Sequence, residues 1–358
     1  MTRKYKVLIV DDSLSICKFL EKVLSMDADL EVVGIALDPY EARDKIKQLL
    51  PDVLTLDVEM PKMDGLTFLK NIMRLRPMPV VMISSLTAAG AQVTLDALQI
   101  GAVDFMVKKH PGSQDDLDAY ASEITTRVKD AARMSISQLG EPLATLDCGD
   151  IKALKDKLDS GSNATRSIKR MVAIGASTGG PEAFRHVLSS FYSPDCAVAI
   201  CQHMPDRFME PFAQRLNKAS KFQIALAEDG EQIRSGCGYV APGERHLVIM
   251  RKNADLFCKL IPSDRVSGHR PSVDVLFESV AESVANGCVG VLLTGMGEDG
   301  AKGLTRLRQQ GAATVVQDKQ SSAVWGMPGR AFEMGGADQV LSLQHIAPSL
   351  NKVLNRAA

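Results

Sequence analysis

The sequence lacks three features that would each indicate a particular class of protein. Its charges balance, with 42 lysines and arginines against 43 aspartates and glutamates, so no basic surface for nucleic acid is expected. No apolar run approaches the roughly 20 residues of a membrane span, and the four apolar residues after the basic start are too few for a signal peptide. We therefore expect a protein that binds no nucleic acid and does not insert into a membrane.

Paired cysteines are also absent. The seven cysteines are an odd number without any C-x-x-C pair, which indicates reduced thiols in the cytoplasm rather than disulfides or a zinc site.

The length of the chain exceeds that of one ordinary core. At about 100 to 200 residues per domain, 358 residues predict two domains. A polar stretch that ends in "DSGSNATRS" reads as a linker. We expect a first domain over 1–125, a linker over 126–167 whose irregular part spans 136–166, and a second domain over 168–358.

Both domains alternate between β-rich runs and segments of helical period. The first contains "KVLIV", "LEVVGIA", "DVLTLD", "PVVMIS" and "VDFMV", which predicts a five-stranded parallel sheet covered by helices. The second contains "RMVAIG", "AVAICQ", "GYVAP", "HLVIM", "VGVLLTG" and "ATVVQ", which predicts a doubly wound, mainly parallel α/β domain. Its strand-rich stretch at 223–261 predicts a small antiparallel portion.

Polar side chains follow four strands of the first domain. Asp11 and Asp12 come after the first strand, and Asp57 after the third. The carboxyl ends of parallel strands meet at one edge, where three carboxylates would repel each other unless a divalent cation held them. Mg²⁺ suits such a site. Ser84 and Lys108 end the fourth and fifth strands and offer a hydroxyl and a cation to a phosphoryl oxygen.

The motifs "VDDS", "LDVEMPKMDG", "ISS" and "FMVKK" resemble the receiver domain of bacterial response regulators over residues 5–125. The resemblance implies a flavodoxin-like fold in which Asp57 accepts a phosphoryl group from a histidine kinase. By the same resemblance, Asp11 and Asp12 help to bind the Mg²⁺ that phosphorylation requires.

The resemblance also assigns Ser84 as the switch hydroxyl and Lys108 as the phosphate contact. The sequence differs from the receiver pattern in one place. Receivers often have a proline directly after this lysine, whereas this chain has Lys109 followed by His110.

In the second domain, "GASTGG" satisfies G-x-S-x-G and predicts Ser177 on a tight turn between a strand and a helix that starts near Pro181. Such a turn suits a nucleophile, a phosphate cradle at a helix N-terminus, or a purely structural role. The stretch lacks the P-loop lysine and does not fit G-x-G-x-x-G, which disfavours a nucleotide site.

A nucleophilic serine needs a base, and the base needs a carboxylate to orient it. His203 directly ends the apolar strand "CAVAICQH", whereas His186 lies within a predicted helix and His246 begins a strand. Asp299 follows the strand "VGVLLTG" and a glycine turn, with Glu298 beside it as the rival carboxylate.

The segments "IGASTGGPEA", "QHMP", "YVAPG", "SGHRPSVDVLFES", "LLTGMGEDGAKGL" and "GMPG" resemble the CheB family of chemotaxis protein-glutamate methylesterases over roughly 168–354. The resemblance implies a serine hydrolase that removes methyl groups from γ-glutamyl esters on chemoreceptor helices, releases methanol and deamidates certain glutamines. No cofactor is implied for hydrolysis. Ser177 matches the nucleophile, His203 the base and Asp299 the orienting acid.

Two backbone amides are candidate oxyanion donors. Thr178 follows the nucleophile, and the family resemblance points to Met296 in the turn "TGMG". The segment "SGHRPSVD" at 267–274 is a loop at the rim of the site, in contact with substrate or only with solvent.

Phosphorylation of Asp57 is expected to relieve an inhibition of the second domain, because it adds negative charge at one edge of the receiver. A different class of function remains open at this point: a phosphorylation switch whose second half docks partners and catalyses nothing.

Overall fold

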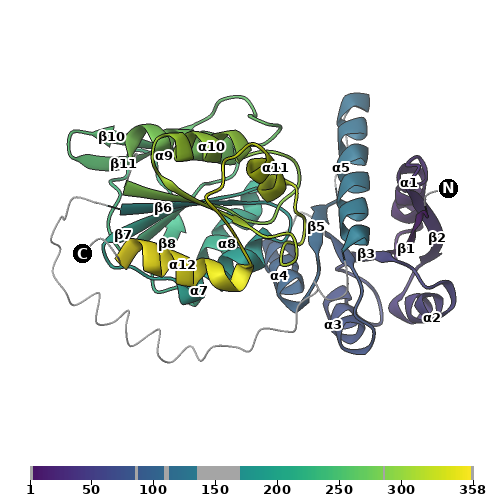
Figure 1. Cartoon of the computed structure of the whole chain (residues 1–358). Helices are drawn as coiled ribbons and strands as arrows, with labels where there is room; N and C mark the ends of the chain where they lie inside the picture. Colours follow the sequence, from purple (N-terminus) through teal and green to yellow (C-terminus); the bar gives the residue numbers. More distant parts are fainter. Residues whose placement is uncertain (1–2, 85–87, 109–112, 135–169, 285–286, 356–358) are drawn as a thin grey trace. The chain divides into compact units, whose positions relative to one another are not determined.

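The computed structural model describes residues 3–84, 88–108, 113–134, 170–284 and 287–355. The chain forms two compact units, Met1–Leu143 and Ala144–Ala358, and each is an α/β domain (Figure 1). The fold class expected from the sequence is confirmed. The irregular stretch expected at 136–166 lies outside the described residues, and the proposed domain boundaries stay predictions.

The first unit is a five-stranded parallel sheet in the order β2-β1-β3-β4-β5. Helices α1 and α5 lie on one face and α2, α3 and α4 on the other (Figure 1). The elements are β1 (Tyr5–Val10), α1 (Leu14–Ser25), β2 (Leu30–Ala36), α2 (Pro39–Leu49), β3 (Val53–Asp57), α3 (Gly65–Leu75), β4 (Val80–Ser84), α4 (Ala88–Ile100), β5 (Asp104–Val107) and α5 (Gln114–Arg133). All five apolar runs quoted for the first domain are strands.

Aspartate caps fix where two helices of this unit, α2 and α3, begin. The Asp38 carboxylate accepts hydrogen bonds from the amides of Tyr40 and Glu41 and so caps α2. Asp64 caps α3 by accepting from the Thr67 amide. Gly65 passes so close to β3 that a Cβ there would lie 2.0 Å from the Asp57 carbonyl oxygen, so only glycine lets α3 start beside that strand end.

The second unit contains a seven-stranded parallel sheet in the order β14-β13-β12-β6-β7-β9-β8. The elements are β6 (Arg170–Ala176), α7 (Gly180–Ser190), β7 (Cys196–Gln202), α8 (Asp206–Ala219), β8 (Gln223–Leu226), β9 (Cys237–Val240), β10 (His246–Lys252), β11 (Asp255–Ile261), α9 (Val273–Ser283), β12 (Cys288–Leu292), α10 (Ala301–Gln309), β13 (Ala313–Gln317), α11 (Met327–Glu333), β14 (Gln339–Leu341) and α12 (Leu343–Asn355).

The expected small antiparallel portion is the hairpin of β10 and β11. This hairpin and helices α9, α10 and α11 share one hydrophobic core on one face of the sheet, while α7, α8 and α12 lie on the other face (Figure 1). The stretch 223–261 also supplies β8 and β9, which join the parallel sheet. None of the helices in the described ranges combines the length and apolar character that a bilayer crossing requires.

The strand order of the second unit creates a switch point. The chain enters the sheet at β6 and adds β7 beside it, then forms the edge strand β8 and inserts β9 between β7 and β8. It then returns to β12 on the other side of β6. The connections that leave β6 and β12 therefore run in opposite directions. Open α/β sheets bind their ligands in the crevice at the carboxyl ends of two such strands.

Helix α9 holds this arrangement together through Phe277, which is fully buried in the core cluster. We expect Phe277→Ala to lower the free energy of unfolding of this unit by about 3 to 5 kcal/mol, since it leaves a large cavity. Met250→Ala is the matched control, because Met250 is 46% exposed and should cost within about 0.5 kcal/mol. Urea unfolding measures both, and equal effects would contradict the assignment of α9 to the core.

Candidate active site

Ser177 occupies the turn between β6 and α7. Its amide donates to the Thr294 carbonyl at 3.0 Å, and its own carbonyl accepts from the Gly180 amide at 2.8 Å. Gly179 takes the left-handed conformation with φ of 77°, so the glycine and not the serine absorbs the unusual backbone geometry. The tight strand-to-helix turn expected from "GASTGG" is present.

His203 and Asp299 form a buried pair at the same edge of the sheet. His203 Nε2 lies 2.7 Å from Asp299 Oδ2, and the two side chains are 5% and 0% exposed. The His203 amide donates to the Ala176 carbonyl at 3.2 Å, which places the histidine beside the serine turn. The structure thus brings together the ends of β6, β7 and the loop after β12.

The orientation of the imidazole follows from this pairing. Because Nε2 faces Asp299, Nδ1 is the ring nitrogen that remains for another partner; it is buried and has no hydrogen-bond partner in the described part of the chain. No hydrogen bond joins Ser177 Oγ to His203 within the same ranges. In enzymes without bound substrate, a hydrogen bond between a nucleophile and its base is often long and tightens only when substrate binds.

Helix α9 points its N-terminus at the Asp299 carboxylate. Asp299 accepts from Ser272 Oγ at 2.8 Å and from the amides of Val273 at 2.7 Å and Asp274 at 3.0 Å. Helix N-termini carry partial positive charge and stabilise anions. Burial acts to raise the pKa of Asp299, but the hydrogen bond from His203 and these amides outweigh it and hold the pKa at about 2. The carboxylate is therefore charged.

The rival residues occupy other environments. Glu298 has a side chain that is 58% exposed, with Arg330 at 3.5 Å. His246 is fully buried at the start of β10, where Nδ1 accepts from the Ser272 amide and Nε2 donates to the Asp264 carbonyl. His246 therefore has a structural role behind α9.

Gln202 was not anticipated from the sequence. Its carboxamide nitrogen donates to the carbonyls of Ser177 at 2.9 Å and His203 at 3.0 Å, and the residue is 2% exposed. It ties the backbones of the serine and histidine segments together. The available signal was an amide side chain at the end of an otherwise apolar strand, which indicates a polar partner nearby.

The candidate oxyanion donors border the serine. Thr178 is buried, and its carbonyl accepts from Thr294 Oγ1 at 2.9 Å. Gly295 packs so closely that a Cβ there would lie 2.9 Å from Ser177 Cβ, which brings the turn containing Met296 next to Ser177. The donor roles of these amides stay predictions.

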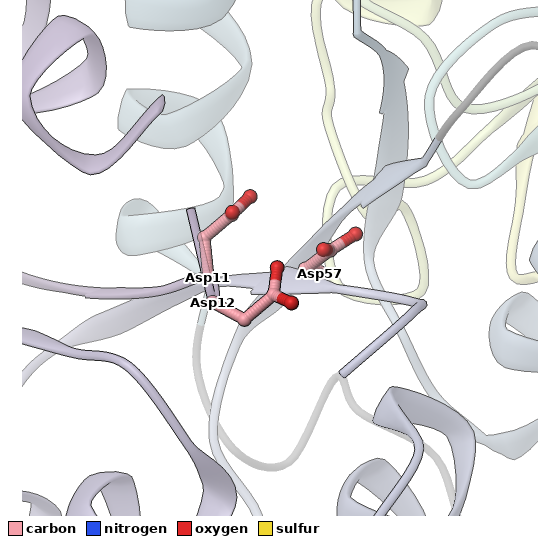
Figure 2. Close-up of side chains that lie close together, drawn as sticks. All are labelled: Asp11, Asp12 and Asp57. Atoms are coloured by element: carbon pink, nitrogen blue, oxygen red, sulfur yellow. The ribbon is translucent and has the colours of Figure 1, made fainter. Parts of the chain in front are cut away.

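The first unit holds a separate acidic pocket. Asp11, Asp12 and Asp57 each offer an oxygen, and these oxygens lie within 4.8 Å of one another (Figure 2). Lys108 Nζ lies 2.9 Å from Asp11 and 2.7 Å from Asp57. The pocket holds three carboxylates and one ammonium group, which contacts two of them, so it retains negative charge and fits a hard divalent cation such as Mg²⁺.

Asp57 is buried, with only 3% of its surface exposed, and burial changes its pKa. Loss of water raises its pKa to about 6, although the hydrogen bond from Lys108 acts in the opposite direction. Ser84 ends β4 opposite Val107 of β5 at the same edge of the sheet, while its side chain, like Lys109 and His110, lies outside the description.

The two domains together define a class of protein: a response-regulator receiver followed by its own enzymatic output domain. A family model described as CheB methylesterase matches residues 172–350, and one described as response regulator receiver domain matches 7–121. The chain belongs to the CheB methylesterase family.

Individual relatives agree with this assignment. The chain is 44% identical over 374 residues to a protein of Hydrogenovibrio crunogenus named protein-glutamate methylesterase/protein-glutamine glutaminase, covering 99% of this chain and 100% of that protein. A protein of Xanthomonas oryzae named protein-glutamate methylesterase/protein-glutamine glutaminase 2 is 49% identical to this chain, and the match covers 96% of each of the two chains. The crystal structure of the Thermotoga maritima CheB methylesterase catalytic domain matches with 35% identity and a TM-score of 0.50, covering 51% of this chain and 98% of that one.

The lowered pKa of Asp299 predicts a pH dependence of stability. The group is held at about 2 against an ordinary 3.8, so its contribution is present above about pH 4 and is lost as the pH falls through 2. The full effect is about 2 kcal/mol. The difference in unfolding free energy between the wild type and Asp299→Asn should be larger at pH 6 than at pH 3 by roughly 1 kcal/mol. Equal differences in urea unfolding at both pH values would show that the carboxylate is not held charged.

Proposed function

We propose that this chain hydrolyses γ-glutamyl methyl esters on the cytoplasmic helices of chemoreceptors, and deamidates glutamines there, through Ser177, His203 and Asp299. The observation that carries the proposal is the buried contact of 2.7 Å between His203 and Asp299 beside the Ser177 turn. A docking module would not require a charged carboxylate buried against an imidazole. The names of the relatives, protein-glutamate methylesterase/protein-glutamine glutaminase, supply the substrate class.

Acylation begins with attack of Ser177 Oγ on the ester carbonyl carbon while His203 Nδ1 accepts the hydroxyl proton. Asp299 holds the proton on Nε2, which keeps the lone pair on Nδ1, and it stabilises the imidazolium that forms. When the tetrahedral intermediate collapses, the bond to the methoxy oxygen breaks. The proton on Nδ1 moves to that oxygen, and methanol leaves an acyl-serine behind.

Deacylation repeats the cycle with water. His203 takes a proton from the attacking water, the acyl bond to Ser177 breaks, and the serine regains its proton as the glutamate carboxylate departs. With a glutamine side chain, the same steps release ammonia. A general base contributes about 10² to 10⁴-fold and each oxyanion donor about 10² to 10³-fold. The amides of Thr178 and Met296 are the proposed donors.

The receiver would control this activity. Asp57 accepts a phosphoryl group from a histidine kinase, and Asp11, Asp12 and Asp57 are the residues that would hold Mg²⁺. When bound, the ion neutralises phosphoryl oxygens during transfer. The phosphorylated side chain carries about two negative charges, where the free carboxylate carries one, and Lys108 and Ser84 would contact the phosphoryl oxygens. The kinase and the receptor helices proposed as partners are cytoplasmic, so we expect this chain in the same compartment. Reduced thiols are usual there, and the six described cysteines are free thiols.

The catalytic assignment predicts distinct effects for neighbouring carboxylates. Ser177→Ala should abolish methanol release from methylated receptor fragments, and Asp299→Asn should lower kcat by about 10⁴-fold, because the wrong tautomer of His203 is then favoured. Glu298→Gln is the matched control and should leave kcat unchanged, since that side chain is 58% exposed and faces Arg330. Full activity in Ser177→Ala would instead favour a second domain that only docks partners.

Regulation predicts a response to a small phosphodonor. Acetyl phosphate with Mg²⁺ should raise the initial rate of methanol release roughly tenfold, a change that needs only about 1.4 kcal/mol of differential stabilisation. Asp57→Asn should remove this response and keep the basal rate. Asp44→Asn serves as the control, because Asp44 is an exposed carboxylate paired with Arg43. A phosphodonor response that survives Asp57→Asn would place the acceptor elsewhere.

A further inference from the structure

The His203 ring has a second neighbour besides Asp299. The ring of His269 stacks on it with centroids 3.6 Å apart and an angle of 5° between the planes. The carboxylate holds the ring at one edge, whereas the stack covers one face. Rotation of the His203 ring about its Cβ–Cγ bond would drive an edge of that ring into His269. The stack therefore restricts the direction in which Nδ1 points.

A tight turn presents His269 to this position. The amide of Val266 donates to the His269 carbonyl at 3.1 Å, and the His269 amide donates back to Val266 at 2.9 Å. The two residues between them, Ser267 and Gly268, have φ of 52° and 81°. Positive φ at both central positions is the geometry of a two-residue hairpin turn, which leaves the backbone of His269 little freedom.

The turn is anchored through the residue before its glycine. Ser267 Oγ donates to Asp274 Oδ2 at 3.1 Å, and Asp274, only 3% exposed, also accepts from the Gly303 amide at 2.8 Å. The turn is thus fixed to the first turns of α9 and α10, and α9 is the helix that holds Asp299.

The other flank of the loop is anchored by Arg270. Its guanidinium donates to the Ser263 carbonyl at 2.8 Å and to the Glu244 carboxylate at 2.6 Å. Anchors on both sides of His269 mean that the stacking is built into the fold and is not a chance contact of a surface loop. A reactive group needs this kind of support, because small errors in its direction are costly.

We propose that His269 is a positioning residue for His203: its ring, stacked on the imidazole, fixes the plane in which Nδ1 faces Ser177. The inference rests on the proposed hydrolase function and extends it, since it assigns a role to a residue outside the Ser177, His203 and Asp299 set. His269 acts through the shape of its ring, so another flat aromatic ring serves in its place.

The kinetic test compares His269→Ala and His269→Phe in the full-length chain, with methanol release from methylated receptor fragments as the readout. His269→Ala should lower kcat by roughly 10 to 100-fold with KM unchanged, as expected for a misdirected base. His269→Phe should retain most of the wild-type kcat. His345→Ala is the matched control, because His345 is exposed on α12 and pairs with Ser342; it should behave as the wild type.

A second readout requires no catalysis. In the chain labelled with ¹³C-histidine, ring-current shifts of the His203 ring protons report the stack, and the spectrum of His203→Gln assigns those signals. The shifts should disappear in His269→Ala and persist in His269→Phe. Persistence in His269→Ala would overturn the proposal.

Three kinetic outcomes would also overturn it. An unchanged kcat in His269→Ala would remove the positioning role, and Ser177-dependent activity in the same assay would show that the hydrolase function still stands. A rise in KM alone would make His269 a substrate contact. Loss of activity in His269→Phe with its ring-current shifts retained would mean that a ring nitrogen of His269, and not the stacking of its ring, supports the activity. If the wild-type chain released no methanol, the hydrolase function would fail, and the proposal that rests on it would fail as well.

Discussion

The second domain depends on one interaction: the charged Asp299 carboxylate at the N-terminus of α9. A carboxylate that is 1% exposed would be neutral without strong donors, and a neutral acid could not support an imidazolium. The donors come from Ser272, Val273 and Asp274, so the helix must begin at that point and pack against the sheet at that depth. The buried apolar face of α9 thus sets the electrostatics of the site.

The two domains place buried carboxylates at the same kind of sheet edge and treat them in opposite ways. Asp57 lies near two other carboxylates, and burial raises its pKa to about 6. Asp299 meets amides, a hydroxyl and an imidazole, and its pKa falls to about 2. The difference matches the proposed roles, since a phosphoryl acceptor is assisted by a cation that arrives from outside, whereas an orienting acid must stay charged throughout the cycle.

Strand ends are visible in a sequence because apolar runs stop at polar residues, and this located Ser177, His203 and Asp299 as well as the receiver carboxylates. Contacts that depend on how distant loops meet are not visible in this way. The stacking of His269 on His203 requires the turn at Val266 to lie over the end of β7, and no local pattern encodes that. The three-residue β14 was missed because so short an exposed strand leaves no periodic signal.

In the proposed proton relay, the main-chain amides of α9, rather than His203 itself, determine which ring nitrogen of His203 accepts the serine proton. Asp299 is held by two amides of α9, so the ring nitrogen that faces it is the one that carries a proton, and the other nitrogen is the proposed base. Here Nε2 faces the acid and Nδ1 is left for the serine, the reverse of the arrangement in chymotrypsin-type proteases. Three groups at the carboxyl edge of a parallel sheet can thus reach the same chemistry with a different chain order and a different ring orientation, because the relay requires only that the acid and the hydroxyl meet opposite nitrogens.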